Sequence, residues 1–166
     1  CECPILVAAA MNTAMWRHPA VQANWQTLQA FPSVLPLQPS AGLLACDRIG
    51  DGRMADPQLI ELAAASLFKD GGKRAIVRRD WQGRRLLVTA GATEERIDAA
   101  RLLSNRSSGR MGVLVAQAAR LRGAEVDLIH GPLQVPSAWL EGLNAHPITS
   151  SQDLERELIR HQPAAD

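Results

Sequence analysis

Residues 86–131 read LLVTAGATEERIDAARLLSNRSSGRMGVLVAQAARLRGAEVDLIHG. The segment opens with an apolar run that stops at Gly91, a pattern typical of a buried strand followed by a turn. A polar loop and a run with helical spacing follow, and Gly123 is the expected helix end. A second strand-like run, 125–131, completes the order strand, loop, helix, strand. This order predicts a βαβ unit, and hence a parallel sheet in an α/β fold.

The helix expected after residue 109 should bury one apolar face against this sheet. The residues predicted to form that face are Met111, Leu114, Val115, Ala118 and Leu121. Further along, Ser150 and Asp153 have the spacing of a capping box and predict another helix start.

The N-terminal part of the chain has its own strand and helix signals. Residues 5–10 form a short apolar run typical of a buried strand. His18-Pro19 and Asp56-Pro57 each predict a helix start, since proline fits the first helical turn. Between these helices, the glycine-containing segment 42–54 is expected to form a mobile loop. We therefore expect two α/β segments, 1–69 and 85–166, joined by a charged, glycine-containing linker at 70–84.

Bulk composition limits the classes of function. Hydrophobic residues make up 46% and charged residues 21% of the 166 residues, with a net charge of +1. This balance does not suggest a nucleic-acid or membrane-surface protein, and the apolar runs are too short to span a bilayer. Three cysteines without a secretory feature predict reduced thiols in the cytoplasm. Cys1-x-Cys3 resembles half of a metal knuckle, but we expect no metal site because no second ligand pair completes it.

Met11 and Asn12 follow the first predicted strand, where parallel α/β sheets place ligands. An amide can hold a carboxylate because it offers donors and an acceptor. The structural alternative is a helix N-cap at Asn12 beside two core methionines, Met11 and Met15.

Residues 44–54, LACDRIGDGRM, could close over a ligand, with Arg48 and Arg53 holding a phosphate or carboxylate. Cys46 could donate a proton if its pKa is near the reference value of about 8.5. The alternative is a surface turn beside a buried cysteine. A dinucleotide fingerprint is not indicated, since the third glycine and the preceding strand are missing.

Ser107-Ser108-Gly109 precedes the helix of the βαβ unit. The free backbone N–H groups of a helix start, together with serine hydroxyls and arginines, suit an anion. Ordinary N-capping is the alternative for these serines.

The first two motifs, AAMNTAMW and ACDRIGDGRM, together resemble the flavin-dependent cysteine decarboxylases, in particular 4′-phosphopantothenoylcysteine decarboxylase. The resemblance covers residues 4–68 and implies a flavodoxin-like domain that uses FMN. It implies that Asn12 binds the substrate carboxylate and that Cys46 reprotonates the reduced intermediate. It also implies these substrate contacts: Met11, Met15, Gly50, Gly52, Arg53 and Met54. Ala9 and Asp47 depart from the family pattern, where proline and glycine are usual.

The run VTAGATEERIDAARLLSNRSSGRMG closely resembles the opening of 4′-phosphopantothenate–cysteine ligase, a Rossmann-like nucleotide-binding domain. The family activates a carboxylate with CTP, accompanied by Mg²⁺, and cysteine then displaces CMP. The resemblance implies that Asn105 handles the acyl-cytidylate. The nucleotide contacts that it implies are Gly91, Thr93, Ser107, Ser108 and Gly109.

The order of the two motif sets matches the fused bacterial enzyme of coenzyme A biosynthesis, which is both a lyase and a ligase. We expect the chain to be an internal piece of it, with the catalytic histidine and most flavin contacts upstream and the ligase lysines downstream. The resemblance implies a homo-oligomer, trimeric in the decarboxylase part and dimeric in the ligase part. The alternatives are a non-catalytic relative of the decarboxylases, a generic NAD(P)-binding module and a fragment without activity.

Overall fold

The computed structural model describes residues 3–45, 48–68 and 79–166, and the chain divides into two compact units, 1–78 and 79–166. Most of the predicted linker, 70–84, lies outside the described residues. Its last part packs on the second unit: the Trp81 N–H donates to the Arg122 carbonyl at 3.1 Å, and the Arg122 guanidinium lies 4.3 Å from the Trp81 ring centre. Among the helices in these ranges, none has the length and apolar character needed to cross a membrane.

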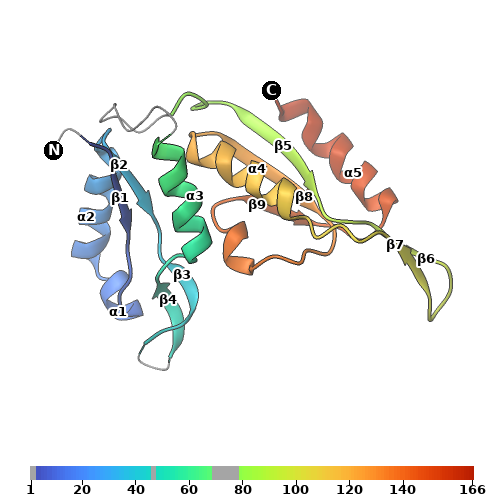
Figure 1. The fold of residues 1–166 in the computed structure, drawn as a ribbon, viewed down its shortest axis with the longest axis horizontal. Coiled ribbons are helices and arrows are strands. Elements are labelled where there is room, and N and C mark those ends of the chain that lie inside the picture. Colours follow the sequence, from blue (N-terminus) through green and yellow to red (C-terminus); the bar gives the residue numbers. More distant parts are fainter. Residues whose placement is uncertain (1–2, 46–47, 69–78) are drawn as a thin grey trace. The chain divides into compact units, whose positions relative to one another are not determined.

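The first unit contains two small sheets and three helices (Figure 1). Its elements are β1 (Ile5–Ala8), α1 (Thr13–Trp16), α2 (Pro19–Ala30), β2 (Val34–Leu37), β3 (Ser40–Leu43), β4 (Ile49–Arg53) and α3 (Pro57–Phe68). Strands β1 and β2 are parallel, as expected for a flavodoxin-like end, and β3 and β4 are antiparallel. The glycine-containing segment therefore contributes to two paired strands, one before and one after residues 46–47, where we expected a loop.

Both predicted helix starts of the first unit are confirmed. His18 caps α2 by accepting from the Ala20 N–H at 3.2 Å, and Asp56 accepts from the Gln58 N–H at 2.9 Å. On α2, Trp25 is buried and meets the Trp16 ring edge-on, with ring centres 5.3 Å apart. The His18 cap and the contact between the two tryptophans hold the start of α2 against α1, the short helix that follows Asn12.

The second unit contains the βαβ unit expected from the sequence, together with a third strand in the main sheet, a separate hairpin and a second helix. Its strands are β5 (Arg85–Ala90), β6 (Glu94–Arg96), β7 (Leu102–Ser104), β8 (Glu125–His130) and β9 (Asn144–Pro147). Its helices are α4 (Arg110–Leu121), α5 (Ser151–His161) and the short 3₁₀ turns η1 (Ser137–Leu140) and η2 (Gln162–Ala164). The main sheet is parallel in the order β5-β8-β9, whereas β6 and β7 form a separate antiparallel hairpin.

Helices α4 and α5 cover opposite faces of the main sheet (Figure 1). Val126 and Leu128 of β8 belong to the same buried cluster as Val113 and Ala116 of α4. Asp127 alternates with them along β8 and contacts α5 instead, because successive strand residues point to opposite faces.

The buried face of α4 agrees only in part with the predicted one, because Leu121 is buried and Leu114 packs against the core cluster as expected. Val113, Ala116 and Gln117 are buried, whereas Met111 and Val115 are 76% and 47% exposed. The small residues Ala116 and Ala119 share the buried cluster with the sheet, and the buried Gln117 amide lies against the segment around η1. Gln117 is tolerated there because its amide donates to the carbonyls of Trp139 and Glu141, at 2.5 and 3.0 Å.

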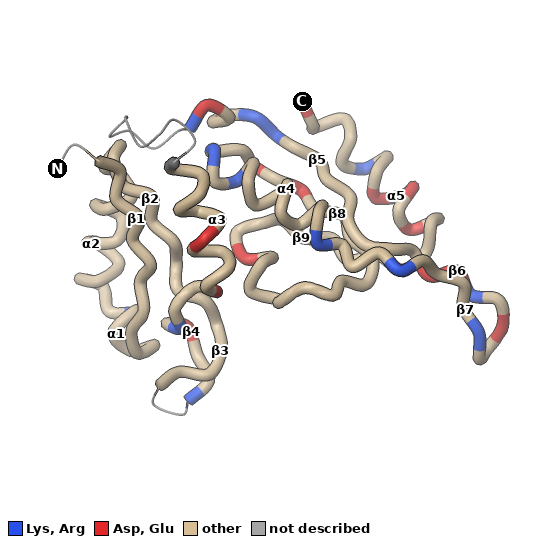
Figure 2. Tube along the Cα trace, viewed as in Figure 1, with Lys and Arg blue, Asp and Glu red and all other residues tan. Residues whose placement is uncertain are grey.

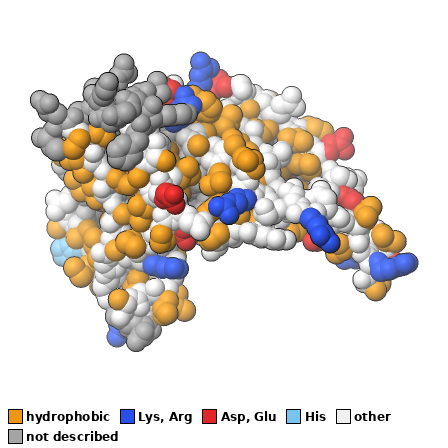
Figure 3. Space-filling model, in the orientation of Figure 1, with side chains coloured by type: hydrophobic (Ala, Val, Ile, Leu, Met, Phe, Trp, Pro, Cys, Tyr) orange, Lys and Arg blue, Asp and Glu red, His pale blue; other side chains and the backbone are white. Residues whose placement is uncertain are grey.

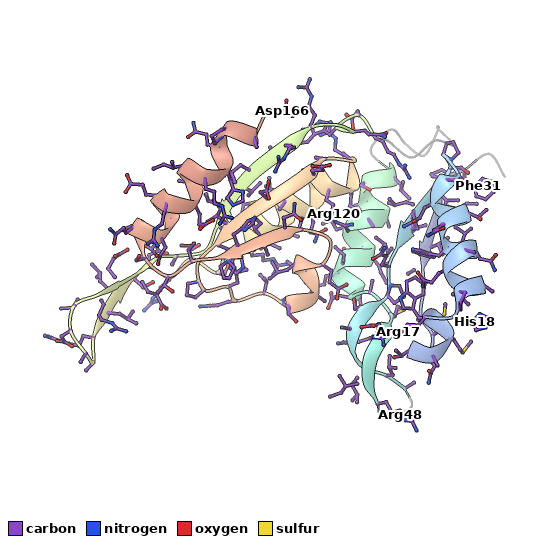
Figure 4. The ribbon with its side chains drawn as sticks, turned by 180° about the vertical axis from the view of Figure 1, so that it is seen from behind. Arg17, His18, Phe31, Arg48, Arg120 and Asp166 are labelled. Carbon is purple, nitrogen blue, oxygen red and sulfur yellow. The ribbon has the colours of Figure 1, made fainter. Side chains whose placement is uncertain are left out.

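Charge is distributed without an extended patch of one sign on α5 or on the β6–β7 hairpin, where basic and acidic residues are interspersed (Figure 2). The hairpin also exposes Ile97, Leu102 and Leu103, and hydrophobic side chains are visible at its end (Figure 3). Asp166 lies beside β5 (Figure 4), where its backbone N–H donates to the Arg85 carbonyl at 3.0 Å and its carboxylate accepts from the Arg85 N–H at 2.8 Å.

The predicted capping box at the start of α5 is confirmed, and it gives a stability test. Ser150 accepts from the Asp153 N–H at 3.2 Å, and Asp153 accepts from the Ser150 N–H at 2.9 Å. Ser150→Ala should destabilise the second unit by about 0.5–2 kcal/mol, since an N-terminal donor of α5 loses its partner. Urea unfolding monitored by circular dichroism measures this change. Gln152→Ala, at an exposed position of the same helical turn, is the matched control, and an equal loss in both variants would contradict the prediction.

Candidate functional site

A cleft of about 780 Å³ lies at the carboxyl ends of β5 and β8 in the second unit. All the predicted nucleotide-binding residues line it: Gly91, Thr93, Ser107, Ser108 and Gly109. The position agrees with the rule that parallel α/β sheets bind ligands outside the carboxyl ends of their strands.

Glycines allow the backbone segments around this cleft to approach one another. A Cβ on Gly131 would lie 1.6 Å from the Ala92 carbonyl oxygen, and one on Gly112 would lie 2.8 Å from the Thr89 carbonyl oxygen. Gly109 has a φ of 73°, and a Cβ on it would lie 3.1 Å from the Gly91 nitrogen. The loop after β5 is therefore packed directly against the first turn of α4.

Hydrogen bonds within residues 105–110 shape this loop. The Asn105 amide oxygen accepts from the Ser107 N–H at 2.8 Å, and the Ser108 hydroxyl accepts from the Arg110 N–H at 3.3 Å. Gly109, the N-cap of α4, provides no side-chain acceptor. The serine hydroxyls and the helix N-terminus thus border a cleft suited to a phosphate or another anion, and the partial positive charge of the helix start favours such a ligand. Asn105 shapes the loop from a position outside the residues that line the cleft.

The sequence did not indicate the apolar wall of this cleft. Met111 and Val115 of α4, Ile148 after β9 and Leu154 of α5 all line it. The helical spacing of Met111 and Val115 was interpreted as core packing, and Ile148 carries no local signal. Only the topology brings the last two residues to the same edge as β5.

The β6–β7 hairpin holds the start of α5 beside the cleft. The Glu95 carboxylate accepts from the Ser151 N–H at 2.7 Å, and hydrogen bonds from the Ser151 backbone and hydroxyl lower the pKa of Glu95. The backbone N–H of Glu94 donates to the Thr149 carbonyl at 2.7 Å. Two segments far apart in the sequence are thereby fixed at one edge of the site.

A second cleft, of about 400 Å³, lies in the first unit. The predicted substrate-site residues that line it are Met11, Asn12, Gly52, Arg53 and Met54. Leu43, Leu44 and Ala45 complete one side of it, next to residues 46–47. Cys46, the predicted proton donor, lies outside the described residues.

The two motifs that form this cleft are joined by backbone contacts. The Met11 N–H donates to the Gly52 carbonyl at 2.8 Å, and a Cβ on Gly52 would lie 2.1 Å from the Met11 carbonyl oxygen. A Cβ on Gly50 would lie 2.2 Å from the Thr13 hydroxyl oxygen. Gly50 and Gly52, the two glycines of β4, are therefore both needed for this strand to pack on the segment after β1.

Asn12 is the N-cap of α1, as the structural alternative required, because its side chain accepts from the Ala14 N–H at 2.8 Å. The same residue lines the cleft, so capping and ligand contact are compatible. The other half of that alternative is wrong: Met15 is 58% exposed and does not belong to the core. Neither Met15 nor Gly50 is among the residues that line this cleft.

Among the residues that line the first-unit cleft Arg53 is charged, and an ion pair of Arg17 with Asp51 lies on the strand next to it. Arg17, labelled in Figure 4, donates to the Asp51 carboxylate of β4 through Nε at 3.1 Å. The aliphatic part of the Arg53 side chain passes over Gly42, where a Cβ would lie 3.1 Å from Arg53 Cδ. The guanidinium of Arg53 and the Asn12 amide can hold an anionic group, and the apolar residues that line the cleft can contact the rest of a largely apolar ligand.

The fold and the two clefts define an α/β protein with clefts of small-ligand size at the carboxyl ends of parallel strands. Comparison with protein families makes this specific. Residues 81–166 match the DNA/pantothenate metabolism flavoprotein C-terminal domain, and residues 1–67 match the Flavoprotein family. The chain therefore belongs to the DNA/pantothenate metabolism flavoprotein family, which confirms the relationship inferred from its motifs.

Similar proteins support this assignment across nearly the whole chain. The chain is 40% identical to the coenzyme A biosynthesis bifunctional protein CoaBC of Mycobacterium bovis, over 99% of this chain and 38% of that protein. It is 34% identical to the protein of the same name from Bacillus subtilis, over 98% of this chain and 38% of that protein. A crystal structure of the C-terminal domain of a CoaBC protein superimposes with a TM-score of 0.50 and 38% identity, over 53% of this chain and 44% of that one.

The chain thus spans about two fifths of the length of these curated relatives. One further relative has a different name. A cysteine/cysteine sulfinic acid decarboxylase from an unknown prokaryotic organism is 38% identical over 95% of this chain and 43% of that protein.

The packing of β4 gives a prediction for the cleft in the first unit. Gly52→Ala places a methyl group against the Met11 backbone, whereas the control Gly42→Ala meets only the flexible Arg53 side chain. Both glycines have positive φ, of 131° and 151°, so backbone strain affects both variants. Gly52→Ala should be the less stable variant by about 1–3 kcal/mol, the usual cost of overpacking. Urea unfolding tests this, followed by tryptophan fluorescence, to which Trp16 and Trp25 contribute from the first unit and Trp81 and Trp139 from the second. Equal midpoints for the first-unit transition would contradict the steric account.

Proposed function

We propose that this chain forms part of a bifunctional enzyme of coenzyme A biosynthesis, which ligates cysteine to 4′-phosphopantothenate and decarboxylates the product. The observation that supports this most is the agreement between two motif sets and two clefts. Each motif set lines one cleft, in a separate unit, in the order expected of the fused enzyme. Relatives with that name match both units.

In this proposal, residues 1–69 are the end of a decarboxylase domain, 70–84 a linker and 85–166 the start of a ligase domain. The enzyme would be cytoplasmic and homo-oligomeric, with a trimeric decarboxylase part and a dimeric ligase part. Its ligands would be 4′-phosphopantothenate, cysteine and CTP. A non-catalytic role is not favoured, because the cleft residues are present and the relatives are named as enzymes or as biosynthetic proteins.

The second-unit cleft would bind the nucleotide and its Mg²⁺. A substrate carboxylate oxygen attacks the α-phosphorus of CTP, pyrophosphate leaves, and the amine of cysteine then displaces CMP from the acyl-cytidylate. Backbone N–H groups near Gly109 and the hydroxyls of Ser107 and Ser108 would contact phosphate oxygens. Asn105 would donate its amide N–H to the acyl oxygen as negative charge develops there. Its amide oxygen is already held by the Ser107 N–H, which fixes the orientation of the side chain.

The first-unit cleft would bind the acyl-cysteine. The Asn12 amide can donate to the substrate carboxylate, and the Arg53 guanidinium can hold a phosphate or carboxylate. Met11 and Met54 provide an apolar wall. FMN, held mainly by residues expected upstream, would supply the oxidation of the substrate thiol that makes loss of carbon dioxide easy. Cys46 would return a proton to the intermediate that remains.

The cysteine/cysteine sulfinic acid decarboxylase relative favours a second candidate, a flavin-dependent decarboxylase that acts on a free amino acid. The two candidates differ in their substrates. Purified full-length protein incubated with 4′-phosphopantothenate, cysteine and CTP should release pyrophosphate and form the amide. Release of carbon dioxide from cysteine alone, without consumption of CTP, would support the second candidate instead.

Asn105→Asp in the full-length protein tests the role of the amide. The aspartate keeps an oxygen that can accept from Ser107, so the loop should retain its shape. It loses the donor to the acyl oxygen, and a loss of this kind typically costs about 2.7–4 kcal/mol of transition-state stabilisation. The variant should release one equivalent of pyrophosphate and accumulate acyl-cytidylate, as detected by quenched-flow mass spectrometry.

Ser108→Ala is the companion variant. It should weaken nucleotide binding and slow the formation of the intermediate, rather than its reaction with cysteine. If Asn105→Asp turns over with cysteine at the wild-type rate, the residue only shapes the loop and its proposed catalytic role is wrong.

Cys46→Ser in the full-length protein tests the proton donor. The variant should still release carbon dioxide, but it should accumulate a product two hydrogens lighter than 4′-phosphopantetheine. Mass spectrometry of the product separates the two compounds. Normal product formed at the normal rate would show that the thiol has no part in the reaction.

A further inference from the structure

A cluster of ionisable side chains lies on the α5 side of the main sheet, apart from both clefts. It consists of Asp127 of β8, His146 of β9 and His161 at the end of α5. One nitrogen or oxygen from each side chain can be chosen so that all three atoms lie within 4.8 Å of one another. No local sequence pattern indicates this cluster, because parallel pairing and the return of α5 bring together residues from three separate segments.

The geometry of the cluster is close to that of a metal site. His146 Nε2 lies 3.1 Å from Asp127 Oδ1, and His161 Nδ1 lies 3.9 Å from the same oxygen. In a tetrahedral zinc site with bonds of about 2.0–2.1 Å, neighbouring ligand atoms are about 3.3 Å apart. The two imidazole rings lie beside each other, with centres 4.1 Å apart and planes tilted by 43°. Small side-chain rotations would therefore bring the three atoms into position around one ion.

The two oxygens of Asp127 have different environments. Oδ2 accepts from an Arg85 guanidinium nitrogen at 3.0 Å, which fixes the carboxylate and leaves Oδ1 facing the histidines. The side chain of Asp127 is only 10% exposed, and those of His161 and His146 are 15% and 28% exposed. The ligand atoms are thus partly shielded from water and come from side chains held by packing.

Glu157 gives independent support from the next turn of α5. Its carboxylate oxygen lies 3.3 Å from His161 Nε2, the ring nitrogen that faces away from Asp127 Oδ1. Nε2 is buried and has no hydrogen-bond partner in the described part of the chain. Histidines that bind a metal usually donate their other ring N–H to a carboxylate or carbonyl group. Glu157 lies close enough to accept this hydrogen bond after a small change in the orientation of the His161 ring, if Nδ1 of His161 binds the ion.

We propose that Asp127, His146 and His161 form a binding site for a divalent transition-metal ion of the Zn²⁺ class. Two imidazoles and one carboxylate suit Zn²⁺, Co²⁺ or Ni²⁺, whereas Mg²⁺ and Ca²⁺ prefer ligand sets made of oxygen atoms. Water would complete the coordination. The ion would join β8, β9 and α5, and so hold in place the helix whose Leu154 forms part of the second-unit cleft.

The experiment is a metal titration of the chain after its cysteines have been alkylated, which removes competing thiolates. Wild-type chain should bind one equivalent of Zn²⁺, show the visible absorption of nitrogen- and oxygen-bound Co²⁺, and unfold at a higher temperature until EDTA is added. His146→Asn and His161→Gln should each weaken Zn²⁺ binding by at least about 10–100-fold, the range seen even for loss of a residue that only supports a ligand.

His18→Asn is the matched control, because asparagine keeps the helix cap of α2 but removes an imidazole. Its affinity for Zn²⁺ should equal that of wild type. Modification of wild-type histidines by diethylpyrocarbonate, mapped by mass spectrometry, gives a measurement that does not depend on folding of the variants. Zn²⁺ should protect His146 and His161 but not His18. Absence of this protection, or wild-type affinity in His146→Asn or His161→Gln, would overturn the proposal.

Discussion

The close approach of backbone segments at the carboxyl edge of β5 and β8 constrains the whole second unit. No side chain fits between Gly131 and Ala92, or between Gly112 and the end of β5. Because these contacts fix the loop after β5 against the first turn of α4, they place serine hydroxyls and helix N–H groups around one space. The apolar cluster beneath, with Leu128 fully buried, keeps the two strands in register. The suitability of the cleft for an anion is therefore a consequence of main-chain packing more than of any single charged residue.

Much of the fold could be predicted from local signals. The βαβ unit, the helix starts at Pro19 and Pro57 and the capping box at Ser150 all rest on short-range chemistry, and the structure confirms each of them. The segments with mixed signals were less predictable. The β3–β4 and β6–β7 hairpins were expected to be loops, because glycines and charges mask the pairing of short strands. The predicted buried face of α4 was wrong for Met111 and Val115, since spacing alone does not show which apolar residues face a ligand cleft instead of the core.

The candidate sites likewise contain residues that local motifs indicate and residues that only the folded structure brings together. Motif resemblance indicated residues contributed by loops, and most of them line the expected clefts. It did not indicate Ile148 or Leu154, which reach the second-unit cleft only through the order of the strands. It also gave no sign of Asp127, His146 and His161, whose proximity depends on the register of β8 with β9 and on the course of α5. Contacts set by topology need the folded structure, because no local sequence pattern encodes them.

The placement of the methionines has a practical consequence. The chain has 4 methionines, of which Met11 and Met54 line the first-unit cleft and Met111 lines the second-unit cleft. Flexible thioether side chains adapt to different contents of a cavity, and their methyl groups give sharp NMR signals even in large assemblies. A sample labelled only at methionine methyl groups would thus contain separate spectroscopic reporters for the two clefts, so that occupancy of each could be followed in one spectrum.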